Sequence, residues 1–147
     1  MKINYPAVVV SAIAYWILGA LWYSPLLFSR TFISLKGWTP EDVAAIQAAG
    51  AGREIAIAFA SSLLLAYVLA HFIKFTGAET LRAGLATGFW LWLGFVITTN
   101  LETVIFEKRP LGLYLINNGY HLVGMLGMGA LLAVWRRRDS RVPAYQT

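Results

Sequence analysis

One acidic side chain falls inside an otherwise apolar stretch of this sequence, and it is the residue best suited to chemistry. Glu102 lies four residues before Phe106, at the end of a long hydrophobic run. If that run is a helix, the carboxyl group lies about 6 Å inside it. A carboxylate in such a place is costly to keep, and it can carry a proton, bind a cation or pair with a base. Glu102 is therefore the first candidate functional residue.

A second apolar run carries three polar residues at helical spacing. Asn117, Tyr120 and His121 recur at i, i+3 and i+4, so they share one face of a helix. A tight turn between the two runs would bring Asn100 level with Asn117. We therefore expect a small polar pocket near Glu102. The binding candidates are Glu102, Asn100, Asn117, Tyr120 and His121.

These residues also have a purely structural interpretation. Asparagine, threonine and tyrosine inside membrane bundles commonly form hydrogen bonds between helices, worth about 1 kcal/mol each. Glu102 could cap a helix end or pair with Arg109 or Arg53. His121 could be a packed histidine, or it could act as a proton relay or contact a ligand. The sequence leaves these alternatives open.

The elements that must position these residues are long apolar segments. The chain is 59% hydrophobic and 13% charged, whereas soluble domains are about half apolar and a quarter charged. Four stretches approach the roughly 20 residues that span a bilayer as a helix, at 6–23, 55–73, 83–106 and 111–135. The sequence predicts an all-α membrane protein, a four-transmembrane-helix antiparallel bundle. It forms a single membrane domain over 1–138, with a short polar C-terminal tail at 139–147.

The third stretch should turn Glu102 toward protein. In an α-helix, the face that holds Glu102 also holds Gly84 and Gly88. Two glycines four residues apart let another helix approach closely. We therefore expect this face to pack inside the bundle and to carry Glu102 away from lipid. The last three spans are joined by short connections and should form consecutive antiparallel hairpins.

The first connection, 24–52, is long enough for one or two short interfacial helices. Ser24-Pro25 and Thr39-Pro40 each combine a capping hydroxyl with a proline at the first helical position. The first helix, 25–35, mixes large apolar with polar residues, as a segment at the membrane interface does. The second should end near Gly50, since glycine commonly follows a helix end.

Lysine and arginine counts predict the orientation, because these residues are enriched in cytoplasmic loops. One side of the predicted bundle holds both termini and seven basic residues, and the other side holds five. We therefore expect a multi-pass protein of a bacterial inner membrane with both termini in the cytoplasm. The seven are Lys2, Lys74, Arg82, Arg136, Arg137, Arg138 and Arg141, and the five are Arg30, Lys36, Arg53, Lys108 and Arg109.

The sequence carries no motif of a known catalytic centre. It has no cysteine, which excludes disulfides, thiolate metal sites and cysteine nucleophiles. It also lacks a phosphate-binding P-loop, an H-E-x-x-H zinc motif and a G-x-S-x-G elbow. We expect no enzyme activity, metal or cofactor. The net charge of +5 comes from residues at the ends of apolar runs, so no nucleic-acid partner is expected either.

Three stretches resemble a known family. They are G-A-L-W-Y-S-P-L-L-F at 19–28, F-E-K-R-P at 106–110 and I-N-N-G-Y-H-L-V at 116–123. The chain is similar, from its amino terminus to about Trp135, to small four-helix bacterial membrane proteins grouped as a domain of unknown function, number seventeen sixty-one. The resemblance implies a four-span, single-domain architecture. It implies no activity, substrate or catalytic residue.

Two functions from different classes fit these observations. The first is a non-enzymatic membrane subunit, a homo-oligomer or a partner of another membrane protein, with a polar pocket near Glu102. The alternative is a small proton- or cation-linked transporter or channel that uses Glu102 and His121. In both cases the lipid bilayer is the surrounding medium.

Overall fold

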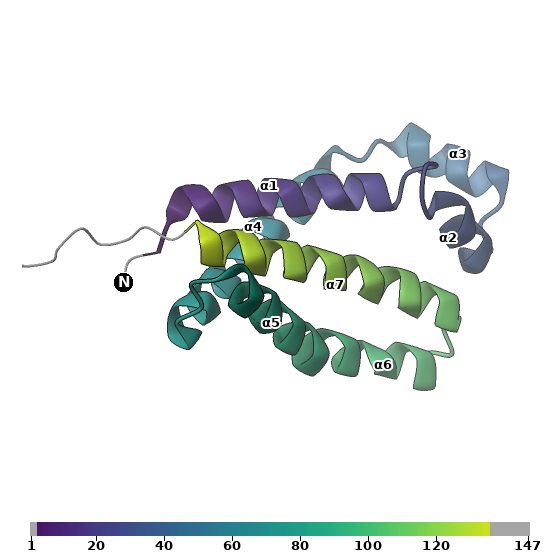
Figure 1. The fold of residues 1–147 in the computed structure, drawn as a ribbon. Helices are drawn as coiled ribbons and strands as arrows, with labels where there is room; N and C mark the ends of the chain where they lie inside the picture. Colours follow the sequence, from purple (N-terminus) through teal and green to yellow (C-terminus); the bar gives the residue numbers. More distant parts are fainter. Residues whose placement is uncertain (1–2, 136–147) are drawn as a thin grey trace, which may run out of the picture.

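The fold is known from a computed structural model that describes residues 3–135, and the regular structure within that range is entirely helical (Figure 1). The predicted tail at 139–147 and five of the seven basic residues expected on the cytoplasmic side, Lys2 and those at 136–138 and 141, lie outside this range. The helices are α1 (Tyr5–Trp22), α2 (Ser29–Lys36), α3 (Pro40–Ala49), α4 (Gly52–Thr76), α5 (Leu81–Leu91), the π-helix η1 (Trp92–Ile97), α6 (Thr98–Ile105) and α7 (Leu111–Val134).

Three of these helices are long and apolar enough to cross a membrane. They are α1, α4 and the continuous helix from Leu81 to Ile105, which comprises α5, η1 and α6. Their bounds lie within three residues of the first three predicted spans. The predicted fourth span corresponds to α7, which has 24 residues and no charged side chain but is not among the three. Its asparagines, histidine and glycines lower its mean hydropathy.

The four long helices run roughly antiparallel, with α7 at the centre (Figure 1). α7 packs against α5, α1 and α4, and at one end against α2. α4 and α5 are consecutive helices joined by the short connection 77–80, but α4 packs mainly against α1. The start of α1 and the end of α7 lie side by side. There the Asn4 side-chain amide donates to the Trp135 carbonyl at 2.7 Å.

The tightest contact is a crossing of α5 and α7 through glycines. A Cβ atom added at Gly84 or Gly88 would meet the backbone of α7 at Gly129 or Met125, and one added at Gly129 would meet the Gly84 carbonyl. The backbones therefore touch without intervening side chains, as the Gly84 and Gly88 spacing predicted. From this crossing α6 diverges from α7 toward the end that carries α2 (Figure 1).

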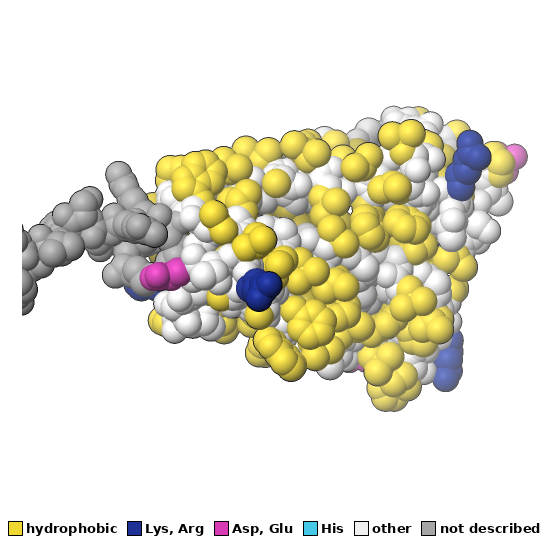
Figure 2. Space-filling view, viewed as in Figure 1, with side chains coloured by type: hydrophobic (Ala, Val, Ile, Leu, Met, Phe, Trp, Pro, Cys, Tyr) yellow, Lys and Arg dark blue, Asp and Glu magenta, His cyan; other side chains and the backbone are white. Residues whose placement is uncertain are grey.

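The outside of the bundle is strongly apolar. Many large hydrophobic side chains are exposed, among them Leu64, Trp90 and Phe95, each more than 60% exposed. Figure 2 shows hydrophobic side chains along the length of one face, with charged side chains near the ends of the helices. Such a surface is compatible with contact with lipid and is unusual for a protein surrounded by water.

The first connection forms two short helices. α3 begins and ends as the sequence predicts, with Thr39 as its N-cap and Gly50 after its last residue. α2 begins at Ser29, four residues later than the predicted start at Pro25. The intervening chain turns instead, because the Ser24 hydroxyl donates to the Leu21 carbonyl at 2.7 Å and the Phe28 amide bonds back to Trp22.

The Thr39 cap predicts that α3 responds to pH. The backbone N–H and the hydroxyl of Thr39 donate to the Asp42 carboxylate at 2.8 and 2.9 Å, and these bonds hold the pKa of Asp42 below its ordinary value of 3.8. The cap therefore stabilises α3 above pH 3.8 and is lost as the pH falls through the lower, folded-state pKa of Asp42. We expect the Thr39 amide resonance in NMR to titrate with a midpoint below 3.8. Asp42→Asn should abolish that titration, and a midpoint at or above 3.8 would contradict the assignment.

Candidate functional site

A π-helical turn in the third long helix decides which side chains face α7. In an unbroken α-helix the face that starts at Gly88 returns after four turns, about 14 residues later, at Glu102. The π-helix Trp92–Ile97 adds about one residue to this interval. Asn100 and Thr103 accordingly take the inward positions and are half-buried, whereas Glu102 is exposed. The predicted inward direction of Glu102 was therefore wrong, although the glycine face itself packs as expected.

Hydroxyl groups donate hydrogen bonds to the backbone carbonyls around this turn. Thr98 and Thr99 donate to the carbonyls of Gly94 and Phe95 at 2.6 Å each. From the facing helix, the Tyr114 hydroxyl donates to the Ile97 carbonyl at 2.7 Å. Because a π-helix disturbs the regular ladder of backbone hydrogen bonds, such donors stabilise it.

Asn118 is the buried centre of the contact between η1, α6 and α7. Its side chain is 2% exposed, accepts from the Asn100 amide at 3.0 Å and donates to the Tyr114 carbonyl at 2.8 Å. Its backbone carbonyl accepts from the Trp92 indole at 2.9 Å. Asn100 was expected level with Asn117, and the structure places it opposite the next residue.

Asn117 and the end of α1 hold the first connection onto α7. The Tyr23 hydroxyl donates to the Asn117 side-chain carbonyl at 2.7 Å. Between the adjacent residues, the Trp22 indole donates to the Ile116 carbonyl at 3.0 Å. Trp22 also packs against Phe28 in a tilted arrangement, with ring centres 4.8 Å apart. These contacts bring α2 over the end of α7.

His121 and Tyr120 face α1 in an aromatic cluster. The Tyr15 hydroxyl lies 2.6 Å from His121 Nδ1, within hydrogen-bond distance. The Tyr15 and Tyr120 rings stack with centres 4.7 Å apart, and the Tyr120 hydroxyl donates to the Tyr15 carbonyl at 3.2 Å. Two tyrosines and one histidine thus form a continuous polar seam inside the bundle.

Two cavities lie on either side of this seam. The polar cavity, of about 320 Å³, lies between α2, α6 and α7 and takes in four of the five candidates, Asn100, Asn117, Tyr120 and His121. The apolar cavity, of about 700 Å³, lies between α1, α4 and α7. Three residues line both cavities: Tyr23, Tyr120 and His121. Glu102 lines neither of them.

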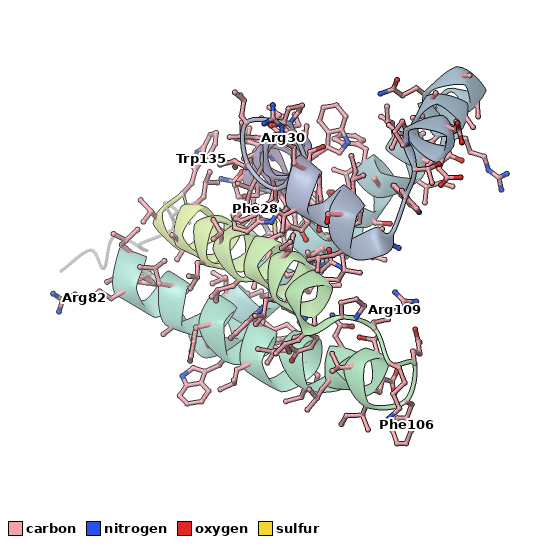
Figure 3. The ribbon with its side chains drawn as sticks, turned by 90° about the vertical axis from the view of Figure 1, so that its right-hand side faces the viewer. Phe28, Arg30, Arg82, Phe106, Arg109 and Trp135 are labelled. Atoms are coloured by element: carbon pink, nitrogen blue, oxygen red, sulfur yellow. The ribbon has the colours of Figure 1, made fainter. Side chains whose placement is uncertain are left out.

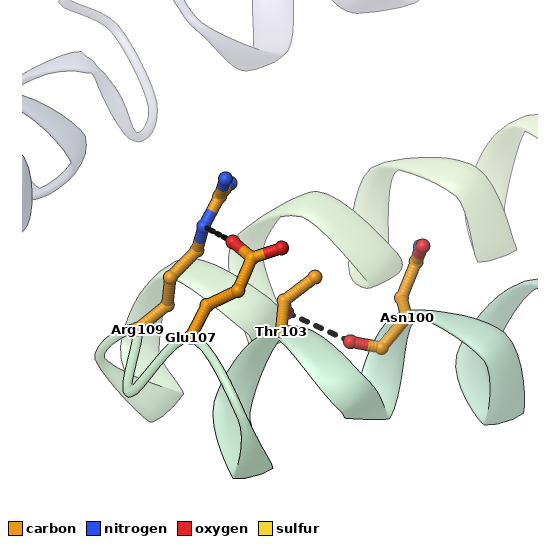
Figure 4. A network of polar contacts seen from close by, with 4 residues as sticks. All are labelled: Asn100, Thr103, Glu107 and Arg109. Carbon is orange, nitrogen blue, oxygen red and sulfur yellow. Dashed lines mark hydrogen bonds and ion pairs between the residues drawn. The ribbon is translucent and has the colours of Figure 1, made fainter.

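Charged groups stand at the mouth of the polar cavity. Lys36 and Arg109 are both among its lining residues. Arg109 Nε pairs with the Glu107 carboxylate at 2.5 Å (Figure 4), so one of the two partners expected for Glu102 is engaged elsewhere. Figure 3, seen from this end of the bundle, shows the Arg109 side chain between α6 and the layer that contains α2.

A comparison with protein families identifies the family of this chain. The model of the family described as a protein of unknown function, DUF1761, matches residues 6–133. The chain belongs to the DUF1761 family. This match confirms the resemblance found in the three sequence stretches, each of which lies within the matched part of this DUF1761 protein. Comparisons with curated proteins and with solved structures gave no match.

Several residues of the site in this DUF1761 protein gave no signal in the sequence. Lys36 reaches the polar cavity only because the first connection folds back over α7, and Tyr23 reaches it from the end of α1. Thr103 lines it only because of the π turn. No group of three or more histidine or acidic residues able to hold a metal ion occurs within residues 3–135. The chemistry that the cavity offers is hydrogen bonding and positive charge.

Proposed function

We propose that this chain is a four-span integral membrane protein whose α5–α6 surface associates with a second copy. α7 is the fourth span in this proposal, because its polar residues turn inward and meet protein partners. The neighbouring ends of α1 and α7 support an even number of crossings. The excess of basic residues on the side of the termini supports a bacterial inner membrane with cytoplasmic termini.

The exposure of Glu102 is the observation that carries the proposed association. Glu102 lies on the outer surface of α6 next to exposed Leu101 and Ile105. A charged side chain that faces lipid within a span is costly. Covering this surface with protein removes the cost, provided that the covering surface offers a hydrogen-bond partner.

The surface around Glu102 is shaped for a close helix contact. Gly94, Thr98 and Glu102 follow one another at four-residue intervals and are all exposed. A Cβ added at Gly94 would meet no side chain and no other helix within 4 Å, so that glycine is free to receive another helix. If a two-fold axis relates two copies of the chain across this surface and runs along the membrane normal, their two Glu102 carboxyl groups lie at the same depth in the membrane.

A large side chain at position 94 tests the association, because it would block the close approach of another helix. We expect the wild-type protein to be a dimer in mild detergent and Gly94→Phe to be largely monomeric, as measured by light scattering on a sizing column. Gly127→Phe is the matched control, because Gly127 also has open space around it but lies on α7. A wild-type monomer in several mild detergents, with no cross-linked dimer in membranes, would overturn the proposal. Cross-linking to a different membrane protein alone would also count against a second copy.

A second candidate function, movement of a small ion or proton, is supported by one observation. The polar and apolar cavities share Tyr23, Tyr120 and His121 as their common wall, so a displacement of these side chains would join them. We expect reconstituted vesicles to dissipate an imposed proton gradient faster than empty vesicles, and His121→Ala to alter that rate. Glu102→Gln should leave the rate unchanged, because Glu102 lines neither cavity. Vesicles without flux would exclude this function.

A further inference from the structure

We infer that the polar cavity is a binding site for a small anion, a phosphate or carboxylate group. This site is separate from the α5–α6 surface proposed to mediate association, so either proposal can fail without the other. The cavity is lined by the cations Lys36 and Arg109, and no aspartate or glutamate is among its lining residues. A cavity with this charge attracts anions.

The π turn keeps negative charge out of the cavity. In an unbroken α-helix Glu102 would face α7, and its carboxylate would repel an anion bound there. The shift in register places the neutral side chains of Asn100 and Thr103 at the lining instead. Glu107, which does not line the cavity, is bound to Arg109 Nε, and the terminal nitrogens of the guanidinium point away from it (Figure 4). π turns are frequent at functional sites.

The donors in the cavity are oriented by their other contacts. The Asn117 carbonyl oxygen accepts from Tyr23, which leaves the Asn117 amide group as a donor with no partner among residues 3–135. The Lys36 ammonium lies 5.7 and 5.5 Å from the ring centres of Phe32 and Trp38, so aromatic contacts hold it near the mouth. Arg109 offers its terminal nitrogens, which suit two oxygens of a phosphate or carboxylate.

The size and position of the cavity limit the kinds of ligand that it can hold. A volume of about 320 Å³ is at the lower limit for small-molecule sites, so the cavity fits a headgroup or a small solute. It lies at the end of the bundle that carries α2 and the α6–α7 turn (Figure 3), where lipid headgroups would lie if the long helices cross a membrane. The anionic group could therefore belong to a lipid or to a free solute.

The test uses the full chain in an uncharged detergent and two probes, inorganic phosphate and short-chain phosphatidylglycerol, titrated by calorimetry. We expect at least one probe to bind with one site per chain. The Lys36→Gln/Arg109→Gln double variant should weaken that binding at least tenfold, since charge-assisted hydrogen bonds are lost. Arg109→Lys, which keeps the charge, should weaken it less. Binding of phosphate would identify a free anion as sufficient, and binding of the lipid alone would identify a headgroup.

Matched controls distinguish binding in the cavity from a general attraction of anions to positive charge on the surface. Arg30 lies on α2 like Lys36, and Lys108 precedes Arg109, but neither lines the cavity. The Arg30→Gln/Lys108→Gln double variant removes the same charge and should change binding less than threefold. Equal weakening by the two double variants, or binding of neither probe to a wild-type chain of native helical content, would overturn the inference.

Discussion

Gly129→Ala is expected to destabilise the protein by about 1–3 kcal/mol, the usual cost of inserting atoms into a packed interior. The added methyl group would lie against the Gly84 carbonyl, and a backbone atom cannot move aside as a flexible side chain can. The helices α5 and α7 must then separate along the tightest contact of the bundle. A lower temperature for loss of the monodisperse peak in detergent would measure the effect.

Gly127→Ala is the control for this substitution. Gly127 lies two residues away on the same helix, and a Cβ added there would meet no side chain and no other helix within 4 Å. The two variants share the same change in helix propensity, so their difference reports the helix contact alone. Equal melting temperatures for the two variants would contradict the close packing of α5 on α7.

Asn118→Leu is expected to have the second large effect. Leucine has a similar size but removes the acceptor of the Asn100 amide and the donor to the Tyr114 carbonyl. Asn118 is 2% exposed and its partners Asn100 and Tyr114 are half-buried, so water replaces the lost bonds only in part. Leaving a buried polar group unpaired costs about 1–3 kcal/mol. We expect a loss of that order in the free energy of unfolding.

A double-mutant cycle isolates the contact between the two asparagines. Asn100→Leu should destabilise the wild-type protein more than it destabilises the Asn118→Leu variant, because in the latter its partner is already gone. The expected coupling is about 0.6–1.7 kcal/mol, the range for hydrogen bonds between membrane helices. Strict additivity of the two substitutions would show that the bond contributes nothing to stability.

Local signals in the sequence were sufficient to locate the helices. Thr39-Pro40 and Gly50 bracket α3 because a capping hydroxyl, a fixed proline φ and a glycine act within one turn of the chain. Gly77 ends α4 in the left-handed conformation, φ 65°, for the same local reason. The exception is Ser24-Pro25, where bonds back to Leu21 and Trp22 turned the chain before α2 could start.

Which face of the third long helix points inward depends on the π turn at Trp92–Ile97, and no pattern in the residues indicated that turn. A single extra residue rotates everything that follows, so the pattern that correctly placed Gly84 and Gly88 in the interior misplaced Glu102. The stabilising contact from Tyr114 to Ile97 joins two helices and exists only after they pack. The cavity with Lys36 at its mouth likewise depends on the folding of the first connection over α7.

Site-directed labelling tests four crossings most directly, and the absence of cysteine from the chain makes each introduced cysteine unique. Intact cells that carry a single cysteine at Glu41, Arg82, Lys108 or Val142, the last beyond the described residues, are treated with a membrane-impermeant maleimide. We expect Glu41→Cys and Lys108→Cys to react in intact cells, and Arg82→Cys and Val142→Cys only after the membrane is opened. Reaction of Lys108→Cys and Val142→Cys from the same side would contradict a span at α7 and the four-helix membrane bundle.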